Sequence, residues 1–232
     1  MKILFVSGFN THPEERDGYK VYKQFELYYR NSPDQLEFFR YKTYEKGDDV
    51  LFRLKTQIHT NEYDAIITHS MGGAFIYRLL NDEQTSHILR KMERIVLLMP
   101  LLYMDPSVNL LVNFTGITDI PVPFSLIIPN SKLVSNESVT TSTQLVICKQ
   151  IKYAYNNLLP TSSFDAVFII NSYSNLRVLF AANDTVATPL PKEYIQKIHK
   201  GQAFILKNGL HEGFRSPDTQ DKFFDLFERM FE

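Results

Sequence analysis

The sequence has few of the features that mark secreted or membrane proteins. Among its 232 residues there is one cysteine, Cys148, so no disulfide can form within the chain, and this fits a reducing compartment. No apolar run is long enough to span a membrane, and we expect no integral membrane segment. The apolar run at residues 3–6 is too short for a secretory signal, so we interpret it as a core strand. We therefore expect a soluble, cytoplasmic protein.

Several kinds of binding site are also missing. The 25 basic and 26 acidic residues give a net charge of −1. Because no basic patch stands out, a nucleic-acid partner is not expected. The sequence has no His-Glu-x-x-His motif, no paired cysteines and no carboxylate cluster, so no metal is expected. It also lacks the glycine-rich patterns of phosphate and dinucleotide sites, so no cofactor is expected.

What the sequence does have is an alternation of apolar runs and amphipathic segments. Hydrophobic residues make up 44% of the chain and charged residues 22%, as in ordinary globular proteins. The length fits a single domain, residues 1–232. Strands are predicted at residues 3–6, 36–41, 65–67, 94–100, 176–182 and 203–206, and helices at residues 19–29, 48–59, 74–80, 163–172, 191–199 and 223–231. This pattern predicts an α/β protein: a three-layer α/β/α sandwich around a mostly parallel sheet of about six strands.

The alternation is interrupted between residues 101 and 160. Four prolines and several apolar clusters occur at 101–129, a polar stretch follows at 130–143, and residues 144–158 are predicted to form a helix. A long, partly apolar insertion after a sheet strand is often a lid or a substrate wall. The alternative is an ordinary helical excursion packed on the sheet.

The stretch around residues 65–80 carries the strongest chemical signal. An apolar run at 65–67 ends at Thr-His-Ser-Met-Gly-Gly, residues 68–73, and an amphipathic segment follows. This predicts a strand, a tight turn and a helix, with Ser70 at the tip of the turn. Glycine is needed in such a turn where a side chain would meet the adjacent strand. The amide of Met71 would point from the helix N-terminus toward an approaching group. The alternative is a strand-to-helix turn closed by small residues.

Two further candidates follow later strands. Asp184 comes after the apolar run 176–182, and His211 comes after the run 203–206. The carboxyl ends of parallel strands share one edge of the sheet, where ligands bind. A serine hydroxyl becomes a good nucleophile when a histidine takes its proton, and a buried carboxylate orients that histidine. The chain order Ser, Asp, His is typical of enzymes with a nucleophile elbow.

These motifs resemble those of α/β-hydrolase fold serine hydrolases, of the esterase and lipase kind, over essentially the whole chain. The family's Gly-x-Ser-x-Gly elbow corresponds to residues 68–72, with Thr68 in place of the first glycine. Its acid turn corresponds to residues 181–184, and its histidine turn to residues 209–212. Its early glycine turn corresponds to residues 7–9, with Ser7 in place of the common histidine. Thr68, a β-branched residue, must fit against the neighbouring helix.

The resemblance implies a role for each residue. Ser70 would be the nucleophile, His211 the general base and acid, and Asp184 the orienting carboxylate. The backbone amides of Met71 and Phe9 would form the oxyanion hole.

Alternatives remain at several of these positions. Asp105 is an alternative triad acid, and Asp184 could instead cap its own turn. His211 could be a surface histidine. Asn10 and His12 could contact substrate or be solvated loop residues, and His69 is given no chemical role.

The function that follows is hydrolysis of a carboxylic ester through an acyl-enzyme. The apolar stretches in 101–129 favour an apolar acyl or alcohol group. A thioesterase or an amidase would use the same triad. A non-catalytic member of the fold that binds a small molecule is a further alternative.

Overall fold

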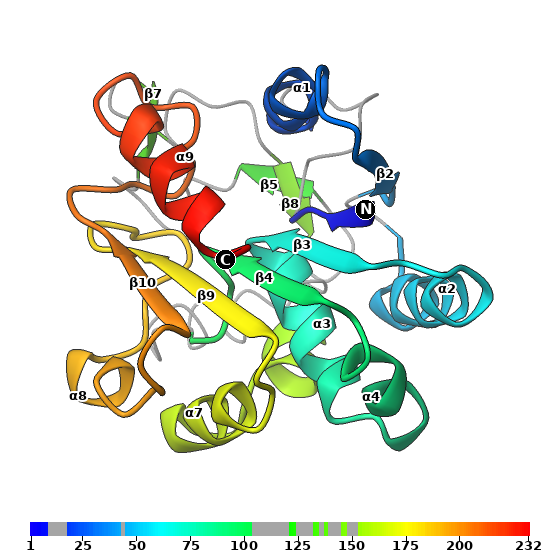
Figure 1. Cartoon of the computed structure of the whole chain (residues 1–232). Helices are drawn as coiled ribbons and strands as arrows, with labels where there is room; N and C mark the ends of the chain where they lie inside the picture. Colours follow the sequence, from blue (N-terminus) through cyan, green and yellow to red (C-terminus); the bar gives the residue numbers. More distant parts are fainter. Residues whose placement is uncertain are drawn as a thin grey trace.

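A six-stranded parallel sheet forms the centre of the molecule (Figure 1). The computed structural model describes residues 1–8, 18–42, 45–103, 121–123, 132–134, 137–138, 145–147 and 153–232. The strands lie in the order β10-β9-β4-β3-β1-β2, and every neighbouring pair is parallel. The six strands are β1 (Lys2–Val6), β2 (Gln35–Phe39), β3 (Ala65–His69), β4 (Arg94–Leu98), β9 (Leu176–Ala181) and β10 (Ala203–Leu206). The predicted α/β architecture, with a parallel sheet of about six strands, is confirmed.

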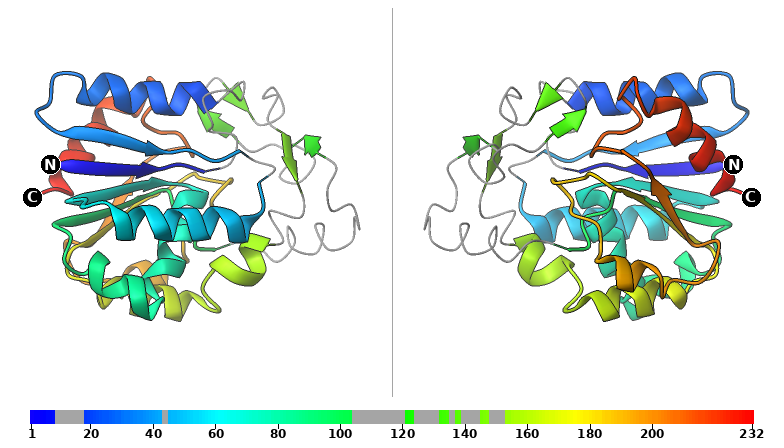
Figure 2. Two further views of the ribbon diagram at one scale, coloured as in Figure 1. Left: turned by 90° about the vertical axis from the view of Figure 1, so that its right-hand side faces the viewer. Right: turned by 90° about the vertical axis from the view of Figure 1, so that its left-hand side faces the viewer.

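Helices cover both faces of this sheet (Figure 2). They are α1 (Gly18–Tyr29), α2 (Gly47–Thr60), α3 (Met71–Leu80), α4 (Glu83–Leu89), the π-helix η2 (Ala154–Leu158), α7 (Ser163–Asn171), α8 (Lys192–Ile195) and α9 (Gln220–Arg229). On one face, α1 and α9 pack on Ile3, Phe5 and Ile67 of the strands. On the other face, α2, α3, α4 and α7 pack on Leu4 and the alternate residues of the same strands.

Burial explains the composition of the central strands. All five residues of β3 are buried, and so are four of the five in β1 and in β4. A parallel strand that is covered by helices on both sides has no solvent-facing side, so it is apolar throughout rather than at alternate positions. The edge strands β2 and β10 are more exposed, with intermediate and exposed positions along their length.

The predicted elements agree with the structure in the sheet and in helices α1, α2 and α7, and differ in some of the other helices. Helix α4 was not predicted, although its N-cap has a clear local signal: Asp82 Oδ1 accepts a hydrogen bond of 2.9 Å from the Thr85 amide. Helix α8 is shorter than the predicted 191–199, and α9 begins three residues before the predicted 223.

The helix predicted at residues 144–158 is wrong in its first part. Residues 145–147 form strand β8 (Leu145–Ile147), which pairs antiparallel with β5 (Pro121–Pro123), with Val146 opposite Val122. The pairing partner lies more than twenty residues away, so local periodicity could not reveal it. A second small pair joins β6 (Lys132–Val134) and β7 (Glu137–Ser138). Most of the predicted lid or wall, residues 101–160, lies outside the described residues.

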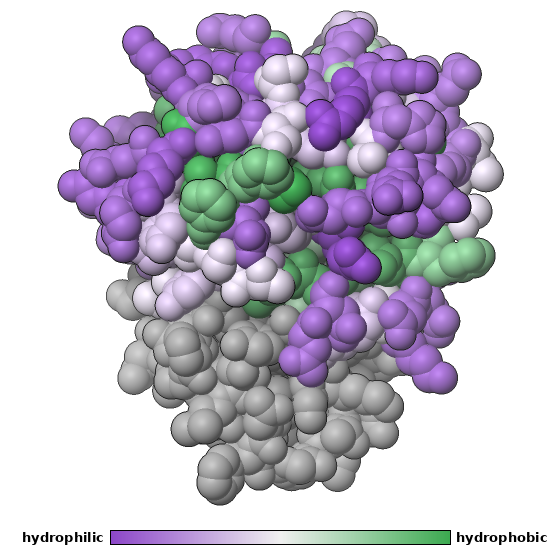
Figure 3. All heavy atoms as spheres, turned by 90° about the horizontal axis from the view of Figure 1, so that it is seen from below, coloured by the Kyte–Doolittle hydropathy of each residue, from purple (hydrophilic) through white to green (hydrophobic). Residues whose placement is uncertain are grey.

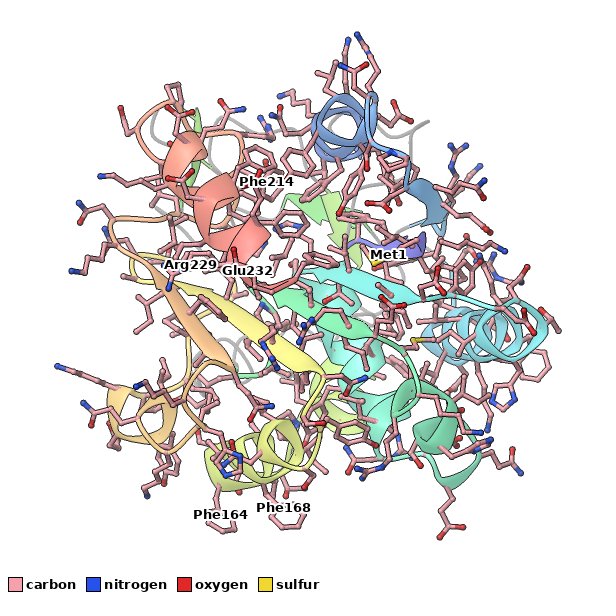
Figure 4. The ribbon with its side chains drawn as sticks, viewed as in Figure 1. Met1, Phe164, Phe168, Phe214, Arg229 and Glu232 are labelled. Carbon is pink, nitrogen blue, oxygen red and sulfur yellow. The ribbon has the colours of Figure 1, made fainter. Side chains whose placement is uncertain are left out.

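Helix α7 exposes two large apolar side chains. Phe164 and Phe168 are 60% and 61% exposed and point away from the body of the molecule (Figure 4). Hydrophobic residues also stand out among hydrophilic ones in the view from below, the side on which α7 lies (Figure 3). Among the described residues, no helix is long and apolar enough to cross a membrane.

Candidate active site

Ser70 occupies a strained turn between β3 and α3. Its backbone has φ 56° and ψ −123°, a conformation that L-residues rarely adopt and that typically costs about 1–3 kcal/mol. Hydrogen bonds hold the turn in place: the Ser70 amide donates to the Leu98 carbonyl at 3.0 Å, and the Ser70 carbonyl accepts from the amides of Gly73 and Leu101. The predicted strand, tight turn and helix are therefore present, with the serine at the tip.

The glycine two residues after Ser70 is required by the neighbouring strand. A Cβ atom on Gly72 would lie 2.0 Å from the carbonyl oxygen of Val6 in β1. No side chain can be accommodated there, because the clash is with backbone rather than with a flexible side chain. Gly73 has a related role, since a Cβ on it would meet Pro100 at 2.5 Å and Thr68 Oγ1 at 3.4 Å. Thr68 is fully buried, and its Oγ1 lies close to Gly73 at the start of α3.

Three of the predicted site residues meet at the carboxyl edge of the sheet. His211 Nε2 lies 3.0 Å from Ser70 Oγ, and His211 Nδ1 lies 2.8 Å from Asp184 Oδ2. An ionised carboxylate can only accept, so Nδ1 carries the proton and Nε2 is left to accept from the Ser70 hydroxyl. Asp184 and His211 are each 4% exposed. The arrangement has the geometry of a base that can deprotonate the serine and is oriented by a buried acid.

Asp184 also organises the turn that carries it. Its Oδ1 accepts hydrogen bonds from the amides of Val186 and Ala187, at 2.8 and 2.9 Å, while Oδ2 faces His211. The alternative prediction, that Asp184 caps its own turn, thus describes one oxygen of a carboxylate whose other oxygen contacts the histidine. These two amides hold the side chain in the orientation that reaches His211.

Gly8 approaches Ser70 from the end of β1. A Cβ placed on Gly8 would lie 2.7 Å from Ser70 Cβ, 3.0 Å from Ser70 Oγ and 3.2 Å from the Met71 amide nitrogen. Met71 is the first residue of α3, so its N–H has no acceptor within the helix. Only a residue without a side chain can therefore approach Ser70 and this amide so closely.

Two residues that the sequence reasoning did not assign support this edge. The hydroxyl of Tyr41 donates to the carbonyl of Ser7 at 2.9 Å and so holds the chain just before Gly8. His69 is 2% exposed, and its Nε2 lies 3.1 Å from the main-chain carbonyl oxygen of His211. The strand period could have indicated the face on which His69 lies, but not a partner 142 residues away.

Other predicted candidates cannot be placed. Phe9, Asn10, His12 and the alternative acid Asp105 lie outside the described residues. Within the part of the chain that is described, no group of three or more His, Cys, Asp or Glu side chains could hold a metal ion.

Solved structures provide the comparison, since the sequence matches no protein-family model and no curated protein. A soluble variant of monoglyceride lipase from Saccharomyces cerevisiae, in complex with a substrate analog, aligns with a TM-score of 0.70 at 11% identity, over 100% of this chain and 85% of that one. A structure from a study of carboxylesterases of a Nitrososphaera thaumarchaeon aligns at 0.64 and 11% identity, over 98% and 88%. The ydeN gene product of B. subtilis aligns at 0.54 and 16% identity, over 98% of both chains.

These likenesses extend over nearly the whole chain at low sequence identity, so they concern architecture. This chain itself has a six-stranded parallel sheet with helices on both faces. The chain has the α/β-hydrolase fold.

Proposed function

We propose that this protein is a serine hydrolase that cleaves carboxylic esters through an acyl-enzyme, with Ser70, His211 and Asp184 as its catalytic triad. The observation that carries the proposal is the position of His211, between Ser70 Oγ at 3.0 Å and Asp184 Oδ2 at 2.8 Å. These residues come from three separate strand ends, and the serine stands in a backbone conformation that costs free energy. Strain of this kind is concentrated at functional sites.

Acylation begins with attack of Ser70 Oγ on the acyl carbonyl carbon. His211 Nε2 takes the hydroxyl proton as the new C–O bond forms. The imidazolium that results is stabilised by Asp184, which stays ionised. When the tetrahedral intermediate collapses, the bond to the leaving oxygen breaks and His211 returns its proton to the leaving alcohol.

The oxyanion of that intermediate needs hydrogen-bond donors on the side of Ser70 that faces Gly8. The amide of Met71 is one such donor, and the amide of Phe9, which lies outside the described residues, is proposed as the second. A single donor of this kind contributes about 2.7–4 kcal/mol to stabilisation of the transition state. The close approach of Gly8 supports this assignment, because a methyl group on residue 8 would lie 3.0 Å from Ser70 Oγ and 3.2 Å from the Met71 amide nitrogen.

Deacylation repeats the same proton movements with water as the nucleophile. His211 Nε2 takes a proton from the water that attacks the acyl carbonyl, and then gives it to Ser70 Oγ as the ester bond to the enzyme breaks. The products are a free acid and the regenerated serine.

We choose an ester as the substrate because similar solved structures include a monoglyceride lipase and a structure from a study of carboxylesterases. A thioesterase or amidase with the same triad is the alternative. The preference for an apolar acyl or alcohol group, and the role of residues 101–160 as a lid or substrate wall, remain proposals, because most of those residues lie outside the described part. The single cysteine fits action in a reducing compartment such as the cytoplasm. The proposed substrate is a small-molecule ester.

The experiment that tests the proposal is labelling with a fluorophosphonate, which reacts selectively with activated serines. The wild-type protein should be labelled and should hydrolyse p-nitrophenyl esters, and Ser70→Ala should lose both. Ser86→Ala is the matched control, since Ser86 lies in α4 and donates to the Glu83 carbonyl, away from the triad. A panel of esters, thioesters and amides then identifies the bond that is cleaved.

Absence of labelling in well-folded wild-type protein would overturn the proposal. The remaining candidate would then be a non-catalytic member of the fold that binds a small molecule at the same edge of the sheet. Equal turnover of short and long acyl chains would contradict only the preference for an apolar group.

A further inference from the structure

His69, the residue before the nucleophile, contacts the proposed base in two ways. Its Nε2 lies 3.1 Å from the carbonyl oxygen of His211, and the two imidazole rings lie 4.8 Å apart between centroids, tilted by 44°. Phe214 meets the His69 ring edge-on at 5.1 Å. His69 therefore touches both the backbone and the ring of His211, from the end of the strand that carries Ser70.

The contact determines the protonation of His69. A carbonyl oxygen only accepts, so Nε2 carries the hydrogen and Nδ1 is a lone-pair acceptor. Burial, with a smaller contribution from the charge of His211, lowers the pKa of His69 well below its ordinary value of 6.5. His69 is thus a neutral imidazole with one defined tautomer.

A donor for Nδ1 is available on the adjacent strand. Neither His69 Nδ1 nor Ser7 Oγ has a hydrogen-bond partner in the structure, although both are buried. Strands β1 and β3 are parallel, with Val6 opposite Thr68, so the next pair in this register is Ser7 and His69. Side chains alternate along a strand, which places both on the face that α1 and α9 cover. To donate to Nδ1, the Ser7 hydroxyl would have to rotate about its Cα–Cβ bond or act through one bridging water.

We propose that His69 is a positioning residue that holds His211 in place by donating its Nε2–H to the His211 carbonyl and by accepting at Nδ1 from the Ser7 hydroxyl. This inference rests on the proposed function and deepens it. The resulting link runs from the end of β1, next to Gly8, to the loop between β10 and α9 that carries His211. It connects the chain beside Gly8, where the oxyanion is proposed to lie, to His211, the proposed base.

The link matters because His211 stands on a loop rather than in a helix or strand. A displacement of about 1 Å in a catalytic group can reduce the rate by about 100-fold. Loss of the Nε2–H donor would leave the His211 carbonyl buried without its partner and the loop free to shift. The distance between His211 and Ser70 would then change even though the fold is kept.

Three variants test this inference. His69→Leu removes both hydrogen bonds and keeps an apolar side chain of similar size. His69→Gln is the conservative rescue, because its amide supplies an N–H donor and an acceptor oxygen. Ser7→Ala removes only the proposed donor to Nδ1. For each we would measure kcat and KM on a p-nitrophenyl ester, and the low-field proton resonance of the hydrogen bond between His211 Nδ1 and Asp184.

We expect kcat to fall by about 10–100-fold in His69→Leu with KM within about twofold, because a misplaced base affects the chemical step rather than binding. The low-field resonance should broaden. His69→Gln should restore most of both signals. Ser7→Ala should have a smaller effect of the same kind, and it should add nothing in combination with His69→Leu.

Unchanged kcat and resonance in His69→Leu would overturn the inference, as would a His69→Gln variant as impaired as His69→Leu. Additive effects of Ser7→Ala and His69→Leu would remove Ser7 from the link. If His69→Leu does not fold, His69→Gln and Ser7→Ala still give the comparison. The resonance does not require turnover, so it tests the positioning role even if the wild-type protein neither reacts with fluorophosphonate nor cleaves esters.

Discussion

The two faces of the sheet are built from different side chains and support different parts of the site. On the face of α1 and α9, phenylalanines pack ring against ring: Phe25 and Phe214 lie 5.2 Å apart, and Phe214 and Phe223 lie 5.4 Å apart. On the face of α2, α3, α4 and α7, the core is mainly aliphatic and contains the elbow helix. On the aromatic face, Phe214 packs against His69, which in turn contacts His211. The aliphatic face includes α3, the helix that begins directly after Ser70.

This difference shows two ways to fix a reactive side chain. The serine is held by backbone, through the close approach of Gly72 to Val6 and through the hydrogen bonds of its own turn. The histidine is held by side chains, since His69 contacts both its carbonyl oxygen and its ring, and Phe214 packs edge-on against the His69 ring. We therefore expect substitutions on the aromatic face to act through packing and those at the elbow to act through local geometry.

The largest effect is expected for Phe214→Ala. Phe214 is fully buried, and loss of a phenylalanine from a core costs about 3–5 kcal/mol. The cavity would also loosen His69, so kcat should fall. The matched control is Phe168→Ala on α7, which removes the same ring from an exposed site and should change the free energy of unfolding by no more than about 0.5 kcal/mol. Urea denaturation of both variants measures the difference, and equal losses would contradict the assigned role of the aromatic core.

Gly8→Ala should have a large effect on catalysis with a smaller one on stability. Its methyl group would lie 3.0 Å from Ser70 Oγ and 3.2 Å from the Met71 amide, where the oxyanion is proposed to sit. Obstruction of one oxyanion donor lowers kcat by about 10²–10³-fold. Gly201→Ala is the control, because Gly201 has φ 86° with no atom near its Cβ position, so its substitution strains the backbone without touching the site. Retention of kcat in Gly8→Ala would argue against the oxyanion position.

Stability should depend on pH through His69. Its pKa is lowered in the folded state, so below about pH 6.5 the unfolded chain binds a proton that the folded chain does not. Stability is therefore lost as the pH falls through the unfolded pKa, by up to about 1.4 kcal/mol per pH unit. Unfolding in urea between pH 7.5 and 5.5 measures the slope. In His69→Gln this slope should fall by the amount that corresponds to one bound proton. An unchanged slope would show that His69 does not cause the pH dependence.

The smallest effect expected is relief of strain at the elbow. Ser70→Gly and Ser70→Ala should both abolish turnover, but only glycine adopts φ 56° without strain. Ser70 makes no side-chain cap bond to α3, so neither variant loses one. After allowance for the greater freedom of glycine in the unfolded chain, Ser70→Gly should be more stable than Ser70→Ala by about 1 kcal/mol. Thermal unfolding of the pair provides the measurement, and a less stable glycine variant would contradict the strain.

Much of the sheet could be predicted because its signals are local. Apolar runs such as residues 3–6 and 94–98 are continuous where helices cover both faces, and the turn at Ser70 contains its own glycines. The prediction of a helix at residues 145–147 was wrong because a short apolar stretch forms a strand only when a distant partner is available. Helix α4 was not predicted, since its seven residues give a weak pattern and its clearest sign is a single capping aspartate.

The candidate site shows the same division. Residue types and chain order were sufficient to select Ser70, Asp184 and His211 as candidates, because each follows an apolar run and its chemistry needs no partner to be recognised. Only the tertiary structure brings Ser70 and His211, 141 positions apart, to within 3.0 Å. It also decides that His69 donates to the His211 carbonyl and that Gly8 approaches Ser70 too closely for a side chain. Strand and turn preferences arise between near neighbours along the chain, whereas these contacts depend on how the strands are ordered in the sheet.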